Sequence, residues 1–219
     1  MEITISENLR DRHKNVQLAM LIIRDAQNKE FDERLEKEKR VIEQYIRETY
    51  KAGIENVGLL KKYNDYYFEF NENYPVKKQM KSILEGKEIP NILCLVDAMY
   101  MTELKYGCLA AGHDLDAIQG NLTLDIAQEG EIYIKINDEE QEVKKDDIVM
   151  RDNSGIIASV LFGPDNRTKI IPISKNIIYI AYFPFLVRRS EKITIIADLA
   201  RLLRICEGPH AKIERMGFY

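Results

Sequence analysis

The chain has 219 residues, with 32 basic and 36 acidic side chains, a formal net charge of −4 and 45% hydrophobic residues. This is an ordinary globular composition, and a chain of this length can bury a stable core without disulfides or metals. The mild acidity argues against a general nucleic-acid coat protein, which would be basic overall, but it leaves room for nucleic-acid contact at one small site.

Targeting signals and cysteine chemistry are both unsupported. The N-terminus lacks a basic region followed by an apolar run, so it does not resemble a secretory signal. The longest apolar stretch, near residues 89–101, is interrupted by a proline and two polar residues and falls short of the ~20 residues that span a bilayer. We therefore expect a cytoplasmic protein. Three cysteines without C-x-x-C spacing are expected to be buried apolar side chains rather than disulfide or zinc ligands: Cys94, Cys108 and Cys206.

The N-terminal half is predicted to be mainly helical. Its expected elements, in chain order, are strands 3–5 and 16–23, a helix over 30–52 and a helix from Pro75 to Leu84. Gly53 can supply the left-handed residue that ends the first helix, and Gly86 follows the second. Residues 56–72 allow no clear assignment.

Aromatic residues crowd the segment before Pro75, and lysines flank them. The rings are Tyr63, Tyr66, Tyr67, Phe68, Phe70 and Tyr74, and the lysines are Lys61, Lys62, Lys77 and Lys78. The rings can pack one edge of the core, or they can stack on nucleobases beside the lysines. The sequence leaves both interpretations open.

A very apolar helix is expected over residues 92–104, with Asn91 as its N-cap. Apolar residues on nearly every face indicate that this helix is buried. A buried carboxylate needs partners, because leaving it unpaired costs several kcal/mol. Asp97 is therefore either a structural hydrogen-bond hub or part of a functional site.

From residue 120 the hydrophobic period changes from helical to two. The alternating segments 122–126 and 132–136 flank Gly130 and predict a hairpin. Further strands are expected at 148–151, 156–162, 168–173 and 176–183, separated by glycine, proline and asparagine.

Ser190 is expected to cap a final amphipathic helix, 191–206, which Gly208 and Pro209 end. Its apolar stripe is predicted to hold Ile193, Ile196, Ala197, Ala200 and Leu203. We predict one α+β domain over residues 1–219, with mainly antiparallel sheet layers and covering helices. It divides into a helical half (1–106), a sheet half (107–187) and the final helix (190–206).

Common catalytic motifs are absent from the sequence. It has no Walker-type loop, GxGxxG, HExxH or GxSxG. His113, with Asp114 and Asp116 beside it, can form a turn, act as a general base or bind a metal. No second histidine or cysteine cluster completes a metal shell, so neither a metal nor another cofactor is expected.

A second polar cluster lies in residues 163–168, between two predicted strands. Arg167 can hold a phosphate or a carboxylate with two hydrogen bonds. Alternatively, Arg167 and Asp165 lock the loop to itself.

Three blocks in a fixed order carry a resemblance to a known family. The first is Ile89-Pro90-Asn91 with Leu95-Val96-Asp97-Ala98. The second is His113-Asp114-Leu115-Asp116-Ala117-Ile118-Gln119-Gly120-Asn121-Leu122-Thr123-Leu124 with Ala127-Gln128-Glu129-Gly130-Glu131, and the third is Asp165-Asn166-Arg167-Thr168-Lys169-Ile170. Together they resemble the tRNA-editing domain of the phenylalanyl-tRNA synthetase beta subunit, and most of all its freestanding relatives. The resemblance covers about residues 40–205.

This resemblance implies a pocket for the aminoacylated end of tRNA and hydrolysis of the ester of a wrong amino acid, in trans. An aminoacyl ester is already activated, so a site mainly needs to position water and stabilise the developing oxyanion. A ribose hydroxyl of the substrate can share in proton transfer. We assign His113 as the base or water-positioning group, helped by Asp114.

The resemblance also implies roles in substrate binding. Asp97 would orient the pocket helix, and Arg167 and Thr168 would contact the terminal nucleotide or the ester and α-amino groups. Tyr100 and Tyr179 would shape the amino-acid pocket. The expected partner is the aminoacylated 3′ end of tRNA, with no DNA and no membrane involved.

Several polar pocket groups of the synthetase domain are replaced in this chain. Its Asp-x-Thr-Asn corresponds to Asp97-Ala98-Met99-Tyr100, its pocket histidine falls at Ala111, and its tyrosine-reading glutamate falls at Tyr179. Three hypotheses follow: a deacylase with a different substrate or water-positioning group, a non-catalytic module that binds tRNA or an amino-acid-like ligand, and a protein-interaction module.

The C-terminal region is a second candidate for contact with nucleic acid. Residues 184–219 are basic in balance, whereas residues 121–152 are strongly acidic. Arg201 and Arg204 on the final helix can contact phosphates of an acceptor stem, or they can simply lie on a solvated helix face.

Overall fold

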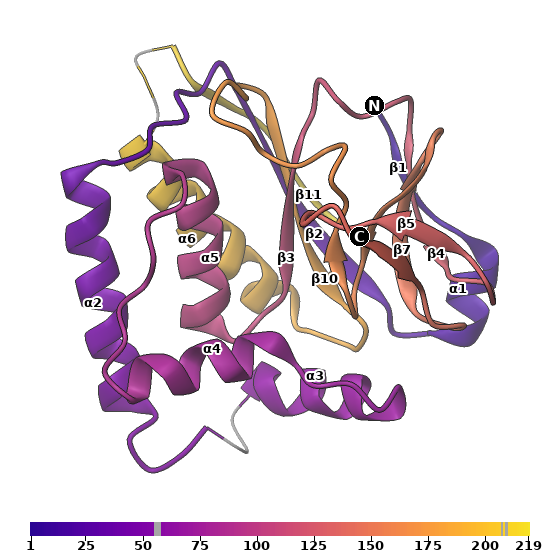
Figure 1. The fold of residues 1–219 in the computed structure, drawn as a ribbon, viewed down its shortest axis with the longest axis horizontal. Coiled ribbons are helices and arrows are strands. Elements are labelled where there is room, and N and C mark those ends of the chain that lie inside the picture. The colour runs from indigo at the N-terminus through magenta and orange to yellow at the C-terminus, as the bar shows by residue number, and fades with distance from the viewer. Residues whose placement is uncertain (55–57, 207, 209) are drawn as a thin grey trace.

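The computed structural model describes residues 1–54, 58–206, 208 and 210–219. Helices cover one face of a four-stranded sheet, and a five-stranded sheet lies on its other side (Figure 1). The predicted α+β class, with mainly antiparallel layers and covering helices, is confirmed. In the described part of the chain, no helix has both the length and the apolar character that a membrane crossing needs.

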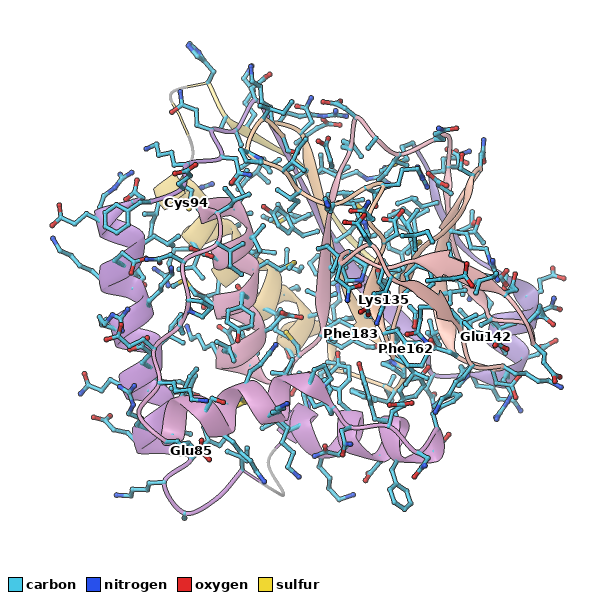
Figure 2. The ribbon with its side chains drawn as sticks, in the orientation of Figure 1. Glu85, Cys94, Lys135, Glu142, Phe162 and Phe183 are labelled. Carbon is cyan, nitrogen blue, oxygen red and sulfur yellow. The ribbon has the colours of Figure 1, made fainter. Side chains whose placement is uncertain are left out.

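The four-stranded sheet is wholly antiparallel and lies in the middle of the molecule. Its strands in spatial order are β11 (Lys212–Phe218), β2 (Gln17–Arg24), β10 (Ile177–Phe183) and β3 (Ala110–Asp114). All seven residues of β10 are buried, because side chains on both of its faces meet other layers. Side chains such as Phe183 fill the spaces between the layers (Figure 2).

The five-stranded sheet contains one parallel pair. Its order is β1 (Ile3–Ile5), β4 (Leu122–Ile126), β7 (Ile148–Asp152), β8 (Gly155–Ser159) and β9 (Gly163–Pro164). β1 runs parallel to β4, and the other neighbours are antiparallel. The N-terminal half thus adds one strand to each sheet, β1 here and β2 in the other, alongside its helices.

Six helices are present in the described chain. They are α1 (Glu7–Arg12), α2 (Glu33–Thr49), α3 (Gly58–Glu69), α4 (Pro75–Leu84), α5 (Cys94–Tyr106) and α6 (Arg189–Cys206). The helix predicted from Pro75 to Leu84 is confirmed as α4. Helix α2 ends at Thr49, four residues before Gly53, whose φ is 117°. Residues 56 and 57 of the segment without a clear assignment lie outside the described chain; the rest of that segment forms α3 and the turn after it.

Gly107 ends α5 in the left-handed conformation, with φ 59°. A Cβ atom there would lie 2.6 Å from Cγ of Leu60. Only glycine therefore allows α5 to stop against α3 and turn directly into β3.

The predicted hairpin of segments 122–126 and 132–136 is wrong. β4 pairs with β1 and β7, whereas β5 (Ile132–Ile134) pairs with β6 (Glu140–Glu142). The alternation exists, but its inward face is reversed: Ile132 and Ile134 are exposed and Tyr133 is buried. The Tyr133 ring belongs to a second small core, and its hydroxyl donates to the Gly163 carbonyl at 2.8 Å.

The strand predicted at 168–173 is also wrong. This segment is a loop with a single bridge, between His113 and Lys169. The Asp165 carboxylate accepts from the Thr168 amide at 3.1 Å, and the Ser174 hydroxyl accepts from the Ile171 amide at 3.0 Å. These side chains replace ladder partners, and such local bonds compete with sheet formation.

Helix α6 starts at Arg189, so Ser190 lies inside it and is not its cap. Ile193 and Ala197 of the predicted stripe are exposed. The buried side holds Lys192, Ile195, Ile196, Leu199, Ala200, Leu202 and Leu203. It is offset and wider than predicted because α6 packs against α5 and also against β2 and β11, a C-terminal strand that the sequence reasoning missed. Gly208 follows the helix, and Pro209 lies outside the described residues.

Candidate functional site

His113 lies on β3 and is completely enclosed. Its Nδ1 is 2.7 Å from Oγ1 of Thr168, and the Thr168 hydroxyl in turn is bonded to the Asp165 carboxylate. A carboxylate only accepts, so the threonine hydroxyl donates to it and the imidazole Nδ1–H donates to the threonine oxygen. These two hydrogen bonds assign the Nδ1–H tautomer to His113 and leave a lone pair on Nε2.

The surroundings keep His113 neutral. Burial, reinforced by the Arg167 charge, lowers the pKa of the imidazole to about 4. Nε2 is buried and has no hydrogen-bond partner in the described chain. His113 thus has the protonation state of a general base, but its free nitrogen has no access to solvent in this conformation.

Arg167 is held by a carboxylate of the chain itself. Its guanidinium makes two hydrogen bonds of 2.9 Å to Asp152 and one of 2.9 Å to the Ala117 carbonyl. The expected lock to Asp165 is only a 3.8 Å contact, from Nε to Oδ2. Arg167 thus binds a carboxylate inside the protein, with both hydrogen bonds to Asp152 donated by Nη2. Sequence reasoning missed Asp152, which sits where a strand meets an Asn-Ser-Gly turn; no local pattern pairs it with Arg167.

Asp114 points away from this cluster, because neighbouring strand residues face opposite sides of a sheet. Its carboxylate accepts from the Ser174 hydroxyl at 2.5 Å and from the Asp116 amide at 3.0 Å. The Ser174 bond fastens the end of β3 to the turn at 171–174, and the Asp116 bond holds the turn that follows β3. No hydrogen bond joins the side chains of Asp114 and His113 in the described chain.

Asp97 is the hydrogen-bond hub at the start of α5. It accepts from Lys39 Nζ at 2.8 Å and from the Ile92 amide at 3.0 Å, and both charged side chains are buried. Asn91 is not the N-cap: the helix begins at Cys94 after Leu93, and the Asn91 side-chain oxygen accepts from Lys39 instead. The buried lysine thus ties the preceding loop to the helix.

The two tyrosines lie on the helical side of the four-stranded sheet or in α5 itself. Tyr179 is fully buried, and its hydroxyl donates to the Leu95 carbonyl at 3.0 Å. Tyr100 is half-buried beside Met99 on α5, and burial raises its pKa to about 12, so the phenol keeps its proton at neutral pH. Ala111, at the position of the synthetase histidine, is buried.

The structure therefore joins His113, Thr168 and Arg167 in one cluster, together with Asp165 and Asp152. We call these five residues the His113 cluster. Within the described chain, no side-chain hydrogen bond links the other four predicted site residues to this cluster: Asp97, Tyr100, Asp114 and Tyr179.

Metal and thiol chemistry find no support among the described residues. No group of three or more histidine, cysteine or carboxylate side chains in that part of the chain could hold a metal ion. The three cysteines are buried and free, as predicted: Cys94, Cys108 and Cys206.

A small hollow of about 300 Å³ lies beside residues 115–120, which belong to the second of the three sequence blocks. Leu115, Ile118 and Gly120 line one side, and residues of β2 and β11 line the other, including Arg24 and Glu214, which form a 2.5 Å ion pair. A volume of this size is at the lower end of small-ligand pockets.

A helical layer over one antiparallel and one mixed sheet defines an α+β fold. It matches an N-terminal fragment of the phenylalanyl-tRNA synthetase beta subunit from Pyrococcus horikoshii, with a TM-score of 0.51 and 10% sequence identity, over 99% of this chain and 53% of that one. A family model described as the B3/4 domain matches residues 63–201, and the chain belongs to this family.

Sequence relatives agree with that assignment. The phenylalanine–tRNA ligase beta subunit of Mycoplasma pneumoniae is 30% identical over 99 residues, which is 45% of this chain and 12% of that protein. The corresponding subunit of Mycoplasma genitalium is 37% identical over 67 residues, 31% of this chain and 8% of that protein. The chain is thus a relative of one domain of the beta subunit, and the aligned part spans about an eighth or less of each of these ligase subunits.

Proposed function

We propose that the chain is a trans-acting aminoacyl-tRNA deacylase of the cytoplasm, which hydrolyses the ester of mischarged tRNA. The observation that carries this proposal is its membership of the B3/4 family, on a fold shared with a tRNA synthetase fragment. Relatives named phenylalanine–tRNA ligase beta subunit support tRNA as the partner.

The chemistry asked of the protein is modest. The ester is activated, so positioning of the substrate and of water supplies most of the catalysis, and the ribose hydroxyl next to the ester can relay the proton. Arg167 is the member of the His113 cluster that reaches the surface, with 35% of its side chain exposed. It is the group we assign to the terminal nucleotide or the ester.

The remaining residues act from within the fold. His113 and Thr168 hold the loop that carries Arg167, and Asp114 holds the turn at 171–174. Asp97 fixes the start of α5, where Tyr100 and Tyr179 shape the amino-acid pocket. In this proposal, His113 positions the loop, and water reaches Nε2 only if the cluster opens.

The test is a panel of tRNAs charged with cognate and non-cognate amino acids. We expect purified protein to release amino acid from at least one mischarged tRNA faster than buffer alone does. Normal binding of the whole panel without release would overturn the proposal.

The His113→Asn variant separates the two roles of the imidazole. Asparagine keeps a nitrogen that can donate to Thr168 and removes Nε2. Retained release supports the positioning role, whereas loss of release with a native circular dichroism spectrum identifies Nε2 as the base.

A second candidate is a non-catalytic module that binds tRNA or an amino-acid-like ligand. Its specific support is that Arg167 is already satisfied by Asp152 and that His113 is enclosed. The same panel decides between the candidates, because this one predicts binding without release.

A further inference from the structure

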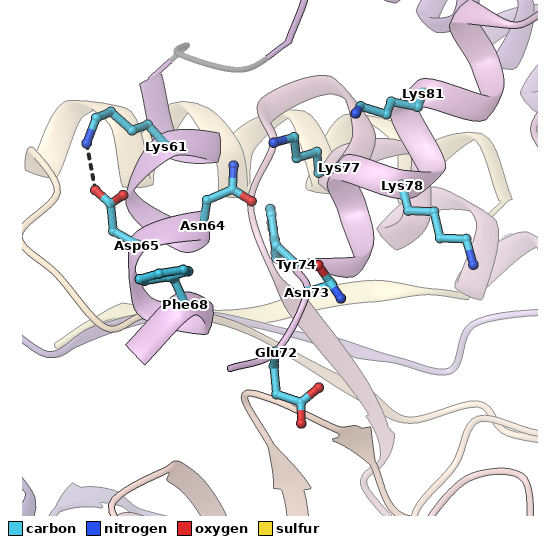
Figure 3. Close-up of a pocket in the computed structure, with 10 residues that line it drawn as sticks. All are labelled: Lys61, Asn64, Asp65, Phe68, Glu72, Asn73, Tyr74, Lys77, Lys78 and Lys81. Carbon is cyan, nitrogen blue, oxygen red and sulfur yellow. Dashed lines mark hydrogen bonds and ion pairs between the residues drawn. The ribbon is translucent and has the colours of Figure 1, made fainter. Parts of the chain in front are cut away.

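A broad groove separates α3 from α4, away from the residues of the His113 cluster (Figure 3). It has a volume of about 770 Å³, and its lining includes four lysines, two asparagines, the acids Asp65 and Glu72, and the rings of Phe68 and Tyr74. We call this feature the α3–α4 groove. Figure 3 shows Lys77 and Lys81 projecting from α4 towards α3, and Lys78 projecting from the other side of α4; α3 carries Phe68 and the paired Lys61 and Asp65.

The charge of the groove is positive even though the chain as a whole is acidic. Both of its acids are ion-paired: Asp65 with Lys61 at 2.7 Å, and Glu72 with Lys144 at 2.6 Å. Lys77 and Lys78 form no ion pair within the described residues. The groove therefore keeps uncompensated positive charge, which fits an anionic partner.

The start of α4 adds to this potential. Pro75 occupies the first turn, and Tyr74, the N-cap residue, makes no side-chain cap bond. The positive end of the helix dipole is thus unopposed by a capping side chain beside Lys77 and Lys78.

One aromatic ring of the groove is left out of the core. The neighbouring tyrosines Tyr63, Tyr66, Tyr67 and Tyr74 are buried, which confirms core packing for most of the aromatic segment. Phe68 is 81% exposed. An exposed ring between lysines and asparagine amides is the arrangement on which unpaired bases stack while their phosphates meet cations.

We propose that the α3–α4 groove binds a single-stranded stretch of RNA. Lys77 and Lys78 contact phosphates, and a base stacks on Phe68. A duplex does not offer its base faces, so the exposed ring favours an unpaired strand. The choice of RNA as the polyanion rests on the proposed function.

The test measures fluorescence anisotropy of a labelled single-stranded RNA 12-mer across a range of salt concentrations. The variant Lys77→Ala/Lys78→Ala is compared with Lys14→Ala/Lys37→Ala, which removes the same charge from exposed lysines elsewhere. Loss of two phosphate contacts reduces the slope of log K against log salt by about 1.4, at roughly 0.7 for each contact. The control keeps the wild-type slope.

Phe68→Ala is paired with Phe31→Ala, another exposed phenylalanine. We expect the Phe68 variant to bind about 5- to 150-fold more weakly with an unchanged salt slope, because stacking involves no counterion release. The Phe31 variant binds as the wild type does.

Three results would overturn the inference: groove variants that behave as their controls, a double-stranded RNA of the same length that binds equally well, or displacement of the RNA by polyglutamate at equal charge, which would indicate an acidic polypeptide site. A failure of this inference and a failure of the deacylase proposal are distinguishable. Groove-dependent RNA binding without ester hydrolysis refutes only the enzyme, and hydrolysis that is unaffected by groove variants refutes only the groove.

Discussion

The His113 cluster and the α3–α4 groove use charged and polar side chains in opposite ways. In the cluster, the hydrogen bonds are satisfied internally, except at Nε2 of His113. In the groove, Asp65 and Glu72 are ion-paired, whereas Lys77 and Lys78 form no ion pair among the described residues and the Phe68 ring is exposed. Polar groups that sequence patterns mark as catalytic can serve to hold a loop, while recognition falls to residues whose partners lie outside the chain.

The largest expected effect comes from breaking the cluster at Asp152. Asp152→Ala removes both Arg167 bonds and the acceptor of the Gln119 and Ser154 amides. We expect a loss of about 3 kcal/mol in the free energy of unfolding. Urea denaturation measures it. Glu33→Ala, which breaks an exposed pair with Lys37, is the control and should cost less than about 0.5 kcal/mol. Equal losses would mean that the cluster is not a structural lock.

Acid should unfold the cluster through His113. Its pKa falls from 6.5 to about 4 on folding, so the unfolded chain binds the proton more tightly between these values. Stability therefore declines as pH falls from 6.5 to 4, by up to about 3 kcal/mol in total. The difference between wild type and His113→Asn isolates this effect, since carboxyl groups far from the cluster titrate in both proteins. A difference that is constant with pH would place the imidazole in contact with water.

A smaller loss is expected from Thr168→Val, which keeps the shape but removes the hydroxyl between His113 and Asp165. Leaving these buried groups unpaired costs about 1–3 kcal/mol. Thr194→Val on the exposed face of α6 is the matched control. Thermal and urea unfolding should show a clearly larger loss in the free energy of unfolding for Thr168→Val than for Thr194→Val. Similar losses would show that the Thr168 hydroxyl does not stabilise the fold.

The smallest stability effects are expected in the groove. Phe68→Ala and Lys77→Ala/Lys78→Ala should each change the free energy of unfolding by less than about 0.5 kcal/mol, because the Phe68 ring and the Lys78 side chain are exposed and neither lysine is ion-paired. The same urea titrations measure this. A loss of more than 1 kcal/mol would show that the groove residues support the fold, as the residues of the His113 cluster do.

The C-terminal helix illustrates how pairing limits a predicted interface. Arg201 was a candidate for phosphate contact, but its guanidinium bonds Asp198 at 2.8 Å and Glu38 at 2.9 Å. Its charge is therefore matched within the chain, unlike that of Lys77 and Lys78. The groove is the better-supported surface for RNA.

The sequence predicts what local periodicity controls. The α+β class, β1, β2, α4, β4, β7 and β10 follow from apolar spacing and turn residues. The pairing of strands that are distant in the sequence does not follow from local periodicity. Nothing near Gly130 indicates that β5 pairs with β6, or that β4 pairs with β1 from the N-terminus.

The same limit applies to the candidate site. The block that contains Arg167 and Thr168 is visible in the sequence, and so is His113. The burial of these side chains cannot be read from the sequence, because it depends on Asp152 and Asp165 and on the packing of two sheets. Phe68 could not be separated from its buried neighbours by residue type; only the direction of α3 exposes its ring.

The most direct test of the account is the rate of amino-acid release from mischarged tRNA with the protein in excess. We expect release above the rate in buffer, which the Lys77→Ala/Lys78→Ala variant slows at low protein concentration and the Lys14→Ala/Lys37→Ala control does not. Release no faster than in buffer for every mischarged tRNA tested would contradict the central claim that this B3/4 domain hydrolyses aminoacyl esters.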